Sequence, residues 1–328
     1  MNDVNEDRAK LSDEAPVPEG LLVSENLPPD HRSGFVVLVG KPNVGKSTLM
    51  NRWLGTKLAP VSPKPQTTRS RLLGILTREE AQVIFVDTPG IHDPRHKLGE
   101  LMVSTARHAV AEADLALFMV DGAFPPTQGD ERVAGLMDAS EEPPVYLVIN
   151  KTDLVTMEEL HDGWAPFVAE HAYAKSFSIS ALTGKGCDDL LDEVVAALPQ
   201  GPRFFPADQI SDIRERVIAA ELIREQLMRH LDQEVPHATA VVVDEYQRRS
   251  EDALYIAATV YVEKESQKGI VIGSGGRMVK RVGTDARHEL ERFTGLNVFL
   301  DLWVKVRKNW RRNERFLRQL GYDPAAGL

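Results

Sequence analysis

The segment at 40–47, GKPNVGKS, constrains the fold of this chain more than any other stretch, because it specifies the elements on either side of it. It follows the apolar run FVVLVG and precedes a segment with helical character. A phosphate-binding loop requires this context of strand, loop and helix. Gly40 and Gly45 permit a tight turn whose amides converge on phosphate oxygens at the start of the helix. Lys46 would neutralise the β- and γ-phosphate oxygens, and the Ser47 hydroxyl would bind Mg²⁺.

Further apolar runs follow the first one along the chain: AQVIFVDT, ADLALFMVD, PVYLVIN and KSFSISA. Near-continuous runs of this kind are typical of strands that are buried on both faces of a parallel sheet. The intervening segments are long enough for crossover helices, which we expect at 47–54, 97–112, 127–138, 157–171 and 187–198. The sequence therefore predicts an α/β fold at 33–200, a P-loop domain with a mainly parallel sheet in three layers.

The motif DTPG ends the second apolar run, and a carboxylate at the end of such a strand faces the crevice where α/β folds bind ligands. Asp87 would hold Mg²⁺, and the Gly90 amide would sense the γ-phosphate. Between the first two motifs lies the polar segment VSPKPQTTRSR. A threonine there would reach Mg²⁺ only when a γ-phosphate is present. Thr67 and Thr68 both qualify, and we prefer Thr68; the alternative is that the segment is a polar connector.

The motif NKTD, which ends the strand PVYLVIN, predicts the base that is bound. Guanine presents N1–H and its exocyclic amine side by side, and the Asp153 carboxylate can accept both hydrogen bonds. Adenine would leave that carboxylate unpaired, which discriminates by orders of magnitude. Asn150 is expected to brace neighbouring loops, and the Lys151 stem is expected to lie on the purine face. The Ala181 amide of the motif SAL would meet guanine O6.

These motifs together predict a GTP-binding domain that hydrolyses GTP with Mg²⁺. We expect catalytic roles for Lys46, Thr68 and Gly90, and metal binding by Ser47, Thr68 and Asp87. The expected nucleotide contacts are Gly40, Asn43, Val44, Gly45, Lys46, Ser47, Thr48, Asp87, Thr88, Gly90, Asn150, Lys151, Asp153, Ser180, Ala181 and Leu182.

The residue after DTPG is Ile91, where many GTPases have a glutamine that orients the attacking water. Isoleucine cannot form that hydrogen bond, so we expect slow hydrolysis by the isolated protein. Asn43 in the phosphate loop is a candidate for holding K⁺ beside the phosphates, where the ion would supply positive charge.

The stretch LPQGPRFFP at 198–206 contains three prolines and a glycine, which exclude a continuous helix or strand. We expect a linker at 201–210, an α+β domain at 211–320 and a tail at 321–328. Within this domain, periodicity predicts a helix at 211–233, strands at 238–246 and 254–263, helices at 269–272 and 277–293, and a strand at 298–306.

The phrase VIGSGGRMVKRVG places a glycine-rich turn between two predicted helices. This fits the GxxG loop of a KH module, where the absence of side chains lets a sugar–phosphate backbone lie against the turn. The expected RNA contacts are Gly273, Ser274, Gly275, Gly276, Arg277, Lys280 and Arg281. Further phosphate contacts are expected from Lys305, Arg307, Lys308, Arg311 and Arg312. Trp303 and Trp310 are candidates for stacking on bases, although we favour a core position for Trp303.

Charge supports this interpretation, because the chain has a net charge of −10 while residues 268–318 contain thirteen Lys or Arg and five Asp or Glu. A basic stripe on an acidic protein indicates one polyanion-binding surface. The single cysteine, Cys187, excludes an internal disulfide. Residues 1–32 are acidic and without an apolar run, which favours a disordered extension over a secretory signal. No stretch has the length of a membrane span.

The combination of GKPNVGKSTLMN, PKPQTTRSR, VDTPGIH, NKTD, SAL and VIGSGGRMVKRVG resembles the Era family, bacterial GTPases with a Ras-like domain followed by a type II KH domain. The resemblance covers residues 33–320. It implies a GTPase that binds the 3′ region of small-subunit (16S) ribosomal RNA in its GTP-loaded state and acts in maturation of the 30S subunit. It also implies a cytoplasmic protein that can associate peripherally with the inner membrane. We expect no stable protein oligomer.

Two alternatives remain open at this point. One is a constitutive RNA-binding protein in which the nucleotide is structural. The other is a related GTPase that matures a different RNA.

Overall fold

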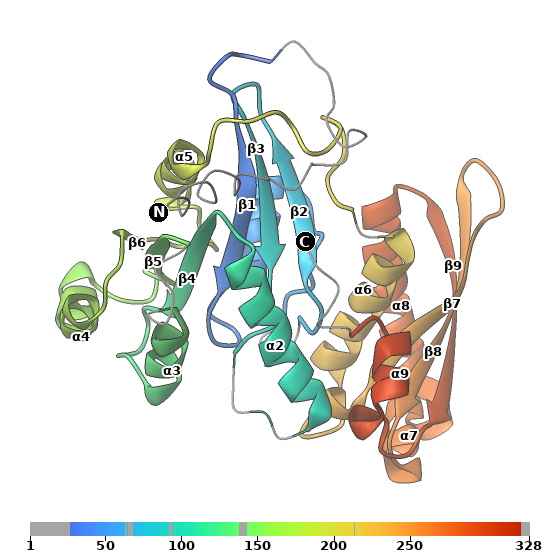
Figure 1. Cartoon of the computed structure of the whole chain (residues 1–328). Coiled ribbons are helices and arrows are strands. Elements are labelled where there is room, and N and C mark those ends of the chain that lie inside the picture. Colours follow the sequence, from blue (N-terminus) through green and yellow to red (C-terminus); the bar gives the residue numbers. More distant parts are fainter. Residues whose placement is uncertain are drawn as a thin grey trace, which may run out of the picture.

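The computed structural model describes residues 27–322, except 63, 65–67, 92–93, 95, 138–142 and 213. The expected disordered extension therefore lies largely outside the described residues, as does the tail from residue 323 onward. The described part forms two units that lie side by side, each with its own sheet (Figure 1).

The first unit contains a six-stranded sheet in the order β2-β3-β1-β4-β5-β6. All neighbouring strands pair in parallel except β2 and β3, which are antiparallel. The strand bounds are β1 Arg32–Val39, β2 Leu72–Thr77, β3 Ala81–Asp87, β4 Leu115–Asp121, β5 Val145–Asn150 and β6 Lys175–Ser178.

Strand β2 was absent from the sequence prediction, which assigned no strand between 55 and 80. Gly74 in its centre weakens the periodic signal, since glycine lowers strand propensity. The structure shows the packing reason for this glycine. A Cβ atom at Gly74 would lie 2.6 Å from Leu54 Cδ1, so its absence lets the end of α1 pack directly on the strand.

Helices cover both faces of this sheet, which confirms the predicted three-layer P-loop fold. Helices α1 and α5 share one apolar cluster with the sheet, and α2, α3 and α4 share another. Alternate residues of β1 enter the two clusters, as expected for a strand buried on both sides. The helix bounds are α1 Lys46–Leu54, α2 Lys97–Ala111, α3 Gln128–Met137, α4 Met157–Glu170 and α5 Cys187–Ala197.

The second unit has the element order predicted for a type II KH domain. Its three-stranded sheet has the order β7-β8-β9, in which β7 and β8 are antiparallel and β8 and β9 are parallel. Helix α7 begins several residues earlier than expected. The bounds are α6 Glu215–His230, β7 Ala240–Arg248, β8 Ala253–Val262, α7 Glu265–Ile272, α8 Arg277–Thr294, β9 Asn297–Val306 and α9 Glu314–Gln319.

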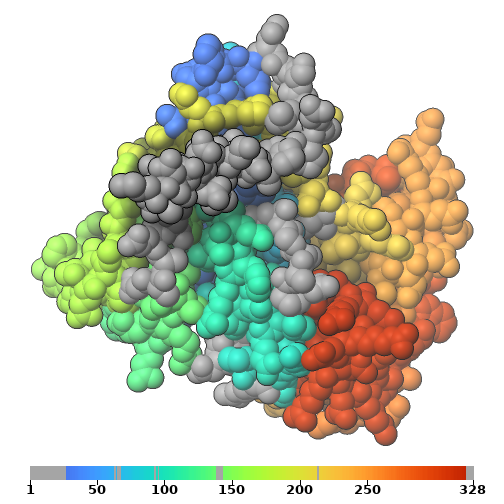
Figure 2. All heavy atoms as spheres, in the orientation of Figure 1, coloured from blue at the N-terminus to red at the C-terminus, as the bar shows by residue number. Residues whose placement is uncertain are grey.

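The two units are in direct contact along α6 and along the lower end of α2 (Figures 1 and 2). Leu98 and Met102 of α2 join an apolar cluster with Trp310 and Phe316 from the C-terminal part of the chain. Helix α6 is buried nearly all round, including polar residues such as Glu225 and Arg224. The buried Glu225 carboxylate pairs through Oε1 with Lys57 Nζ of the first unit at 2.8 Å, so an ion pair joins the two units here.

Candidate nucleotide and nucleic-acid sites

The glycine-rich loop between β1 and α1 has the backbone conformation that its glycines permit. Gly45 precedes α1 and has a φ of 106°, a backbone conformation that residues other than glycine rarely adopt. A Cβ at Gly45 would lie 2.1 Å from Asn150 Nδ2, and one at Gly40 would lie 2.2 Å from Met119 O. The loop therefore packs against the carboxyl-terminal ends of β4 and β5, and this packing fixes the orientation of its backbone amides.

The Lys46 side chain lies within the loop that precedes it. Its Nζ donates hydrogen bonds to Lys41 O at 3.0 Å and to Gly40 O at 3.3 Å. Burial lowers the pKa of Lys46 to about 8, and the nearby Asp87 carboxylate opposes that shift. A desolvated ammonium group of this kind gains most from an anionic ligand, such as a phosphate, placed beside it.

Three oxygen-bearing side chains meet beside Lys46, and we call them the metal corner: Ser47, Thr68 and Asp87. The Ser47 hydroxyl donates to Asp87 Oδ2 at 2.6 Å, and the Thr68 hydroxyl donates to the same oxygen at 3.3 Å. The two hydroxyl oxygens are 3.1 Å apart. Thr67 lies outside the described residues, so Thr68 is the threonine that the structure places here.

Asp87 is fully buried, and its Oδ1 has no hydrogen-bond partner among the described residues. Burial raises the pKa of this carboxyl group, while Lys46 and the two hydroxyl groups counteract the effect. A buried carboxylate oxygen without a partner is costly unless a cation satisfies it. Mg²⁺ prefers hard oxygen ligands of this type, so the residues present fit the predicted metal.

At the other end of the site, Asn150 joins two loops. Its Nδ2 donates to Val44 O at 2.7 Å, and its Oδ1 accepts from the Ala181 amide at 2.8 Å. The exposed Asp153 carboxylate accepts a hydrogen bond from Ser180 Oγ at 2.5 Å, which orients it. Val44 and Ser180 are buried supports here. The Ala181 amide, expected to meet guanine O6, is engaged by Asn150 in this structure.

Two supporting residues, Asp121 and Arg52, were not recognised from the sequence. Lys151 Nζ pairs with Asp121 Oδ2 at 2.5 Å, and this pair fixes the lysine expected to lie on the base. Arg52 Nε donates to Ala181 O at 2.6 Å and so anchors the SAL loop to α1. Arg52 falls within the predicted helix at 47–54. A basic residue in a helix is common, so the sequence does not indicate that it binds the SAL loop.

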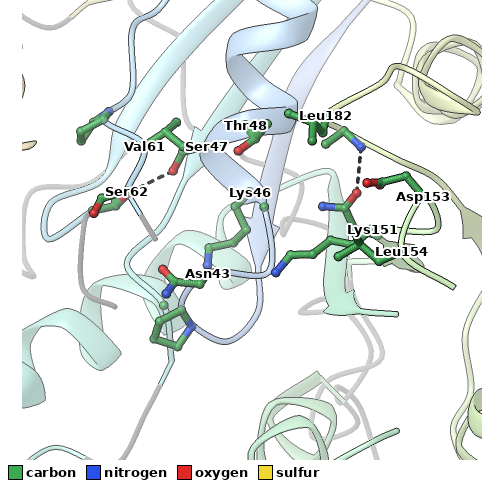
Figure 3. A pocket seen from close by; sticks show the side chains of 17 residues that line it. Asn43, Lys46, Ser47, Thr48, Val61, Ser62, Lys151, Asp153, Leu154 and Leu182 are labelled. Atoms are coloured by element: carbon green, nitrogen blue, oxygen red, sulfur yellow. Dashed lines mark hydrogen bonds between the residues drawn. The ribbon is translucent and has the colours of Figure 1, made fainter. Parts of the chain in front are cut away.

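A cavity of about 460 Å³ connects the two ends. In Figure 3, Ser47 and Ser62 lie on one side, Asp153 and Leu182 lie on the other, and Lys46 is between them. The lining residues are Pro42, Asn43, Gly45, Lys46, Ser47, Thr48, Pro60, Val61, Ser62, Thr68, Gly90, Asn150, Lys151, Asp153, Leu154, Ala181 and Leu182.

Two residues of the DTPG region point away from this cavity. Thr88 was expected to contact nucleotide, but its side chain is fully buried and its hydroxyl donates to Leu38 O at 2.7 Å. Ile91 is 4% exposed and belongs to the apolar cluster beneath the sheet. The position after DTPG therefore presents no side chain to an attacking water.

The GSGG turn joins α7 to α8. Gly273, Gly275 and Gly276 all have positive φ, and the side chains of Arg277, Lys280 and Arg281 are exposed. A Cβ at Gly275 would meet nothing within 4 Å, so its conformation rather than lack of space calls for glycine. The turn also stands at the N-terminus of the long helix α8, where the dipole favours an anion.

The core position that we favoured for Trp303 is wrong: Trp303 is exposed, and Trp310 is the buried tryptophan. Trp303 is 63% exposed, because β9 alternates and this residue is on the face away from α8. Trp310 is fully buried and donates to Ala238 O, which excludes it as a stacking platform. Arg311 pairs with Glu263, and Arg307 lies over the Phe316 ring. These two arginines, expected to contact phosphates, therefore have partners within the protein.

Comparisons with known proteins agree with both units. A family model described as "50S ribosome-binding GTPase" matches residues 35–151, and one described as "KH domain" matches residues 234–311. The chain is 39% identical to Era in a crystal structure with MgGDPNP and nucleotides 1506–1542 of 16S ribosomal RNA, with a TM-score of 0.85. The match covers 89% of this chain and 99% of that one. A single-residue variant of Aquifex aeolicus Era bound to GDP·AlF4⁻ gives the same identity, coverage and TM-score.

Proposed function

The chain belongs to the Era family of GTPases, and we propose that it binds and hydrolyses GTP to control its binding to the 3′ region of 16S ribosomal RNA. The observation that carries this proposal is the geometry of the cavity. A metal corner lies at one end, the Asp153 carboxylate lies at the other, and Lys46 stands between them. We assign the GTP-binding domain to 33–200, the linker to 201–210 and the RNA-binding domain to 211–320.

In this proposal each end of the cavity has one task. Asp153 accepts both donors of the guanine edge, and Leu154 and Leu182, which are largely exposed, flank the purine ring. Ser47, Thr68 and Asp87 hold Mg²⁺, with Thr68 joining when the γ-phosphate is present. Bound there, the ion supplies positive charge to the phosphate oxygens.

Catalysis in this site rests on charge stabilisation and positioning. Water attacks the γ-phosphorus in line, the bond to the β–γ bridging oxygen breaks, GDP leaves, and the proton of the water passes to a phosphate oxygen. Lys46 and the amides of the phosphate loop and Gly90 stabilise the negative charge of the transition state. The burial of Ile91 means that no side chain at that position orients the water. We therefore expect slow hydrolysis unless a partner supplies the missing contact.

The effect of monovalent cations on the rate of hydrolysis tests whether an ion adds positive charge beside the phosphates. Asn43 lines the cavity and belongs to the phosphate loop, where it has a positive φ of 66°. We propose that Asn43 helps to hold K⁺ there, so the rate of hydrolysis should be higher in KCl than in NaCl, by on the order of 10-fold. Asn43→Ala should remove this difference. Equal turnover of the unaltered chain in both salts would contradict the role of K⁺.

The GSGG loop and the exposed bases Lys280 and Arg281 are the proposed RNA contacts, together with Gly273, Ser274, Gly275, Gly276 and Arg277. The identity of the RNA comes from the related Era, whose structure contains 16S ribosomal RNA. We propose that the chain acts in maturation of the 30S subunit in the cytoplasm, with peripheral contact to the inner membrane.

No helix among the described residues is long and apolar enough to cross a membrane.

Crosslinking in cells, followed by sequencing of the bound RNA, tests the proposed substrate. Reads concentrated at the 3′ end of 16S ribosomal RNA would support it. Reads concentrated on another RNA would favour a related GTPase that matures that RNA. The buried Ile91 keeps one further candidate open, a constitutive RNA-binding protein with a structural nucleotide. That candidate predicts that RNA does not stimulate single-turnover hydrolysis.

A further inference from the structure

Arg69 connects the nucleotide site to the second unit. It directly follows Thr68 of the metal corner, and its side chain is 1% exposed. Its guanidinium group donates to Thr239 O at 2.6 Å through Nη1 and to His237 O at 2.9 Å through Nη2. Both carbonyl groups belong to the segment that leads into β7. A side chain from the GTPase unit is therefore bound by the backbone of the KH unit.

The surroundings hold this guanidinium group in one place. It lies 5.8 Å from the centre of the Trp310 ring, and Trp310 is itself fixed by its hydrogen bond to Ala238 O. Burial lowers the pKa of Arg69 to about 10, and the neighbouring Arg224 adds to that effect, while Tyr322 and Glu221 oppose it. A buried cation with these neighbours is costly to retain unless its hydrogen bonds are made.

This anchoring bears directly on Thr68. Consecutive Cα atoms are about 3.8 Å apart, so a bound Arg69 guanidinium group tethers the backbone of residue 68 to the region within one arginine side-chain length of Thr239 O and His237 O. Within that region the Thr68 hydroxyl reaches Ser47 Oγ and Asp87 Oδ2. Thr68 thus makes its contacts in the metal corner, and the next residue, Arg69, makes its contacts in the KH unit.

We propose that Arg69 is a positioning residue for GTP hydrolysis, which acts by holding Thr68 in the metal corner through its anchor in the KH unit. This inference rests on the proposed function. The KH unit then completes the GTPase site, and its detachment would withdraw Thr68. Coupling between sites is reciprocal, so a bound γ-phosphate that retains Thr68 also favours the docked KH unit.

The test uses the full chain with Arg69→Gln, which removes the positive charge and both Nη donors and leaves a shorter, neutral polar side chain. We expect the single-turnover rate of GTP hydrolysis to fall by roughly 10- to 100-fold, because the metal ligand is misplaced. The Mg²⁺ concentration for half-maximal rate should rise. GDP affinity should stay within about twofold, since Thr68 acts only when a γ-phosphate is present.

A double-mutant cycle with Thr68→Ala shows whether Arg69 acts through Thr68. If it does, Thr68→Ala and the double variant should hydrolyse GTP at the same rate. Arg69→Lys retains the charge and a donor group, although on a single nitrogen, so it should restore part of the rate. A double variant slower than Thr68→Ala by the full factor of Arg69→Gln would overturn the proposal.

Lys57→Gln is the matched control, because Lys57 also bridges the two units. Its Nζ contacts Glu225 Oε1 at 2.8 Å and Glu289 Oε2 at 3.0 Å. It lies three residues beyond the end of α1, and that end, Leu54, is about 10 Å along the helix axis from Ser47. This variant should hydrolyse GTP at nearly the unaltered rate, whereas a loss equal to that of Arg69→Gln would assign the effect to docking in general.

Failure of this proposal is distinguishable from failure of the proposed function. An unaltered chain that does not hydrolyse GTP contradicts the proposed function itself. An unaltered chain that hydrolyses GTP, combined with additive effects in the cycle or with a parallel loss of GDP affinity in Arg69→Gln, contradicts only the role of Arg69.

Discussion

Replacing Asp153 with asparagine should change the preferred nucleotide of this chain from GTP to XTP. The carboxylate, held by Ser180 Oγ at 2.5 Å, accepts the two donors of the guanine edge in our account. Asparagine offers one acceptor and one donor, and xanthine has N1–H beside a carbonyl group, which matches that pair. GTP would then face a donor with its own amine, and its affinity should fall by on the order of 100-fold or more.

Titration calorimetry with GDP and XDP measures this change without hydrolysis. Melting temperatures in the absence of nucleotide serve as the control, because Asp153 is exposed and its replacement should leave the fold intact. Restored binding by XDP distinguishes a switch of recognition from simple damage to the site. Unchanged GDP affinity in Asp153→Asn would contradict the assigned base contact.

Placing two acidic residues in the GSGG loop, as Ser274→Asp with Gly275→Asp, should abolish RNA binding while nucleotide binding is retained. Two carboxylates would stand where a phosphate backbone approaches, and each like-charge contact costs about 1–4 kcal/mol near a protein surface. We expect RNA affinity to fall by on the order of 100-fold or more. Gly273 is left unaltered, because a Cβ there would lie 2.7 Å from Met278 Cβ. Gly275 has a φ of 61° but open space around it, and aspartate is one of the few residues other than glycine that adopt this left-handed conformation.

The matched control adds the same two charges to the first unit, as Gly135→Asp with Gly163→Asp. A Cβ at either position meets nothing within 4 Å, so both substitutions fit. Filter binding or fluorescence anisotropy with the 3′ segment of 16S ribosomal RNA gives the affinities. If the loop variant and the control variant bind RNA equally well, the GSGG loop is not the RNA contact.

The parallel strands of the first unit and the positions of its motifs could be predicted from the sequence, because strands buried on both faces leave unbroken apolar runs. The antiparallel strand β2 could not be predicted in this way, since Gly74 interrupts its run. Glycine is needed at this position because Leu54 packs against it, and this contact can be recognised only from the three-dimensional structure.

Contacts between residues that are distant in the sequence were equally difficult to predict. The sequence predicted that Ser47, Thr68 and Asp87 belong to one site, because each is part of a recognisable motif. It did not identify Arg69, whose partners are backbone carbonyl groups about 170 residues away. The favoured core position of Trp303 was wrong, because composition does not reveal which face of β9 is covered by helices.

The RNA affinity of the full chain in two nucleotide states tests the central claim most directly. The 3′ segment of 16S ribosomal RNA is titrated with the chain loaded with Mg²⁺ and a non-hydrolysable GTP analogue, and then with Mg²⁺ and GDP. Our account predicts tighter binding with the analogue, by about 5- to 150-fold, the usual range of coupling between two sites. Equal RNA affinities in the two states would contradict it.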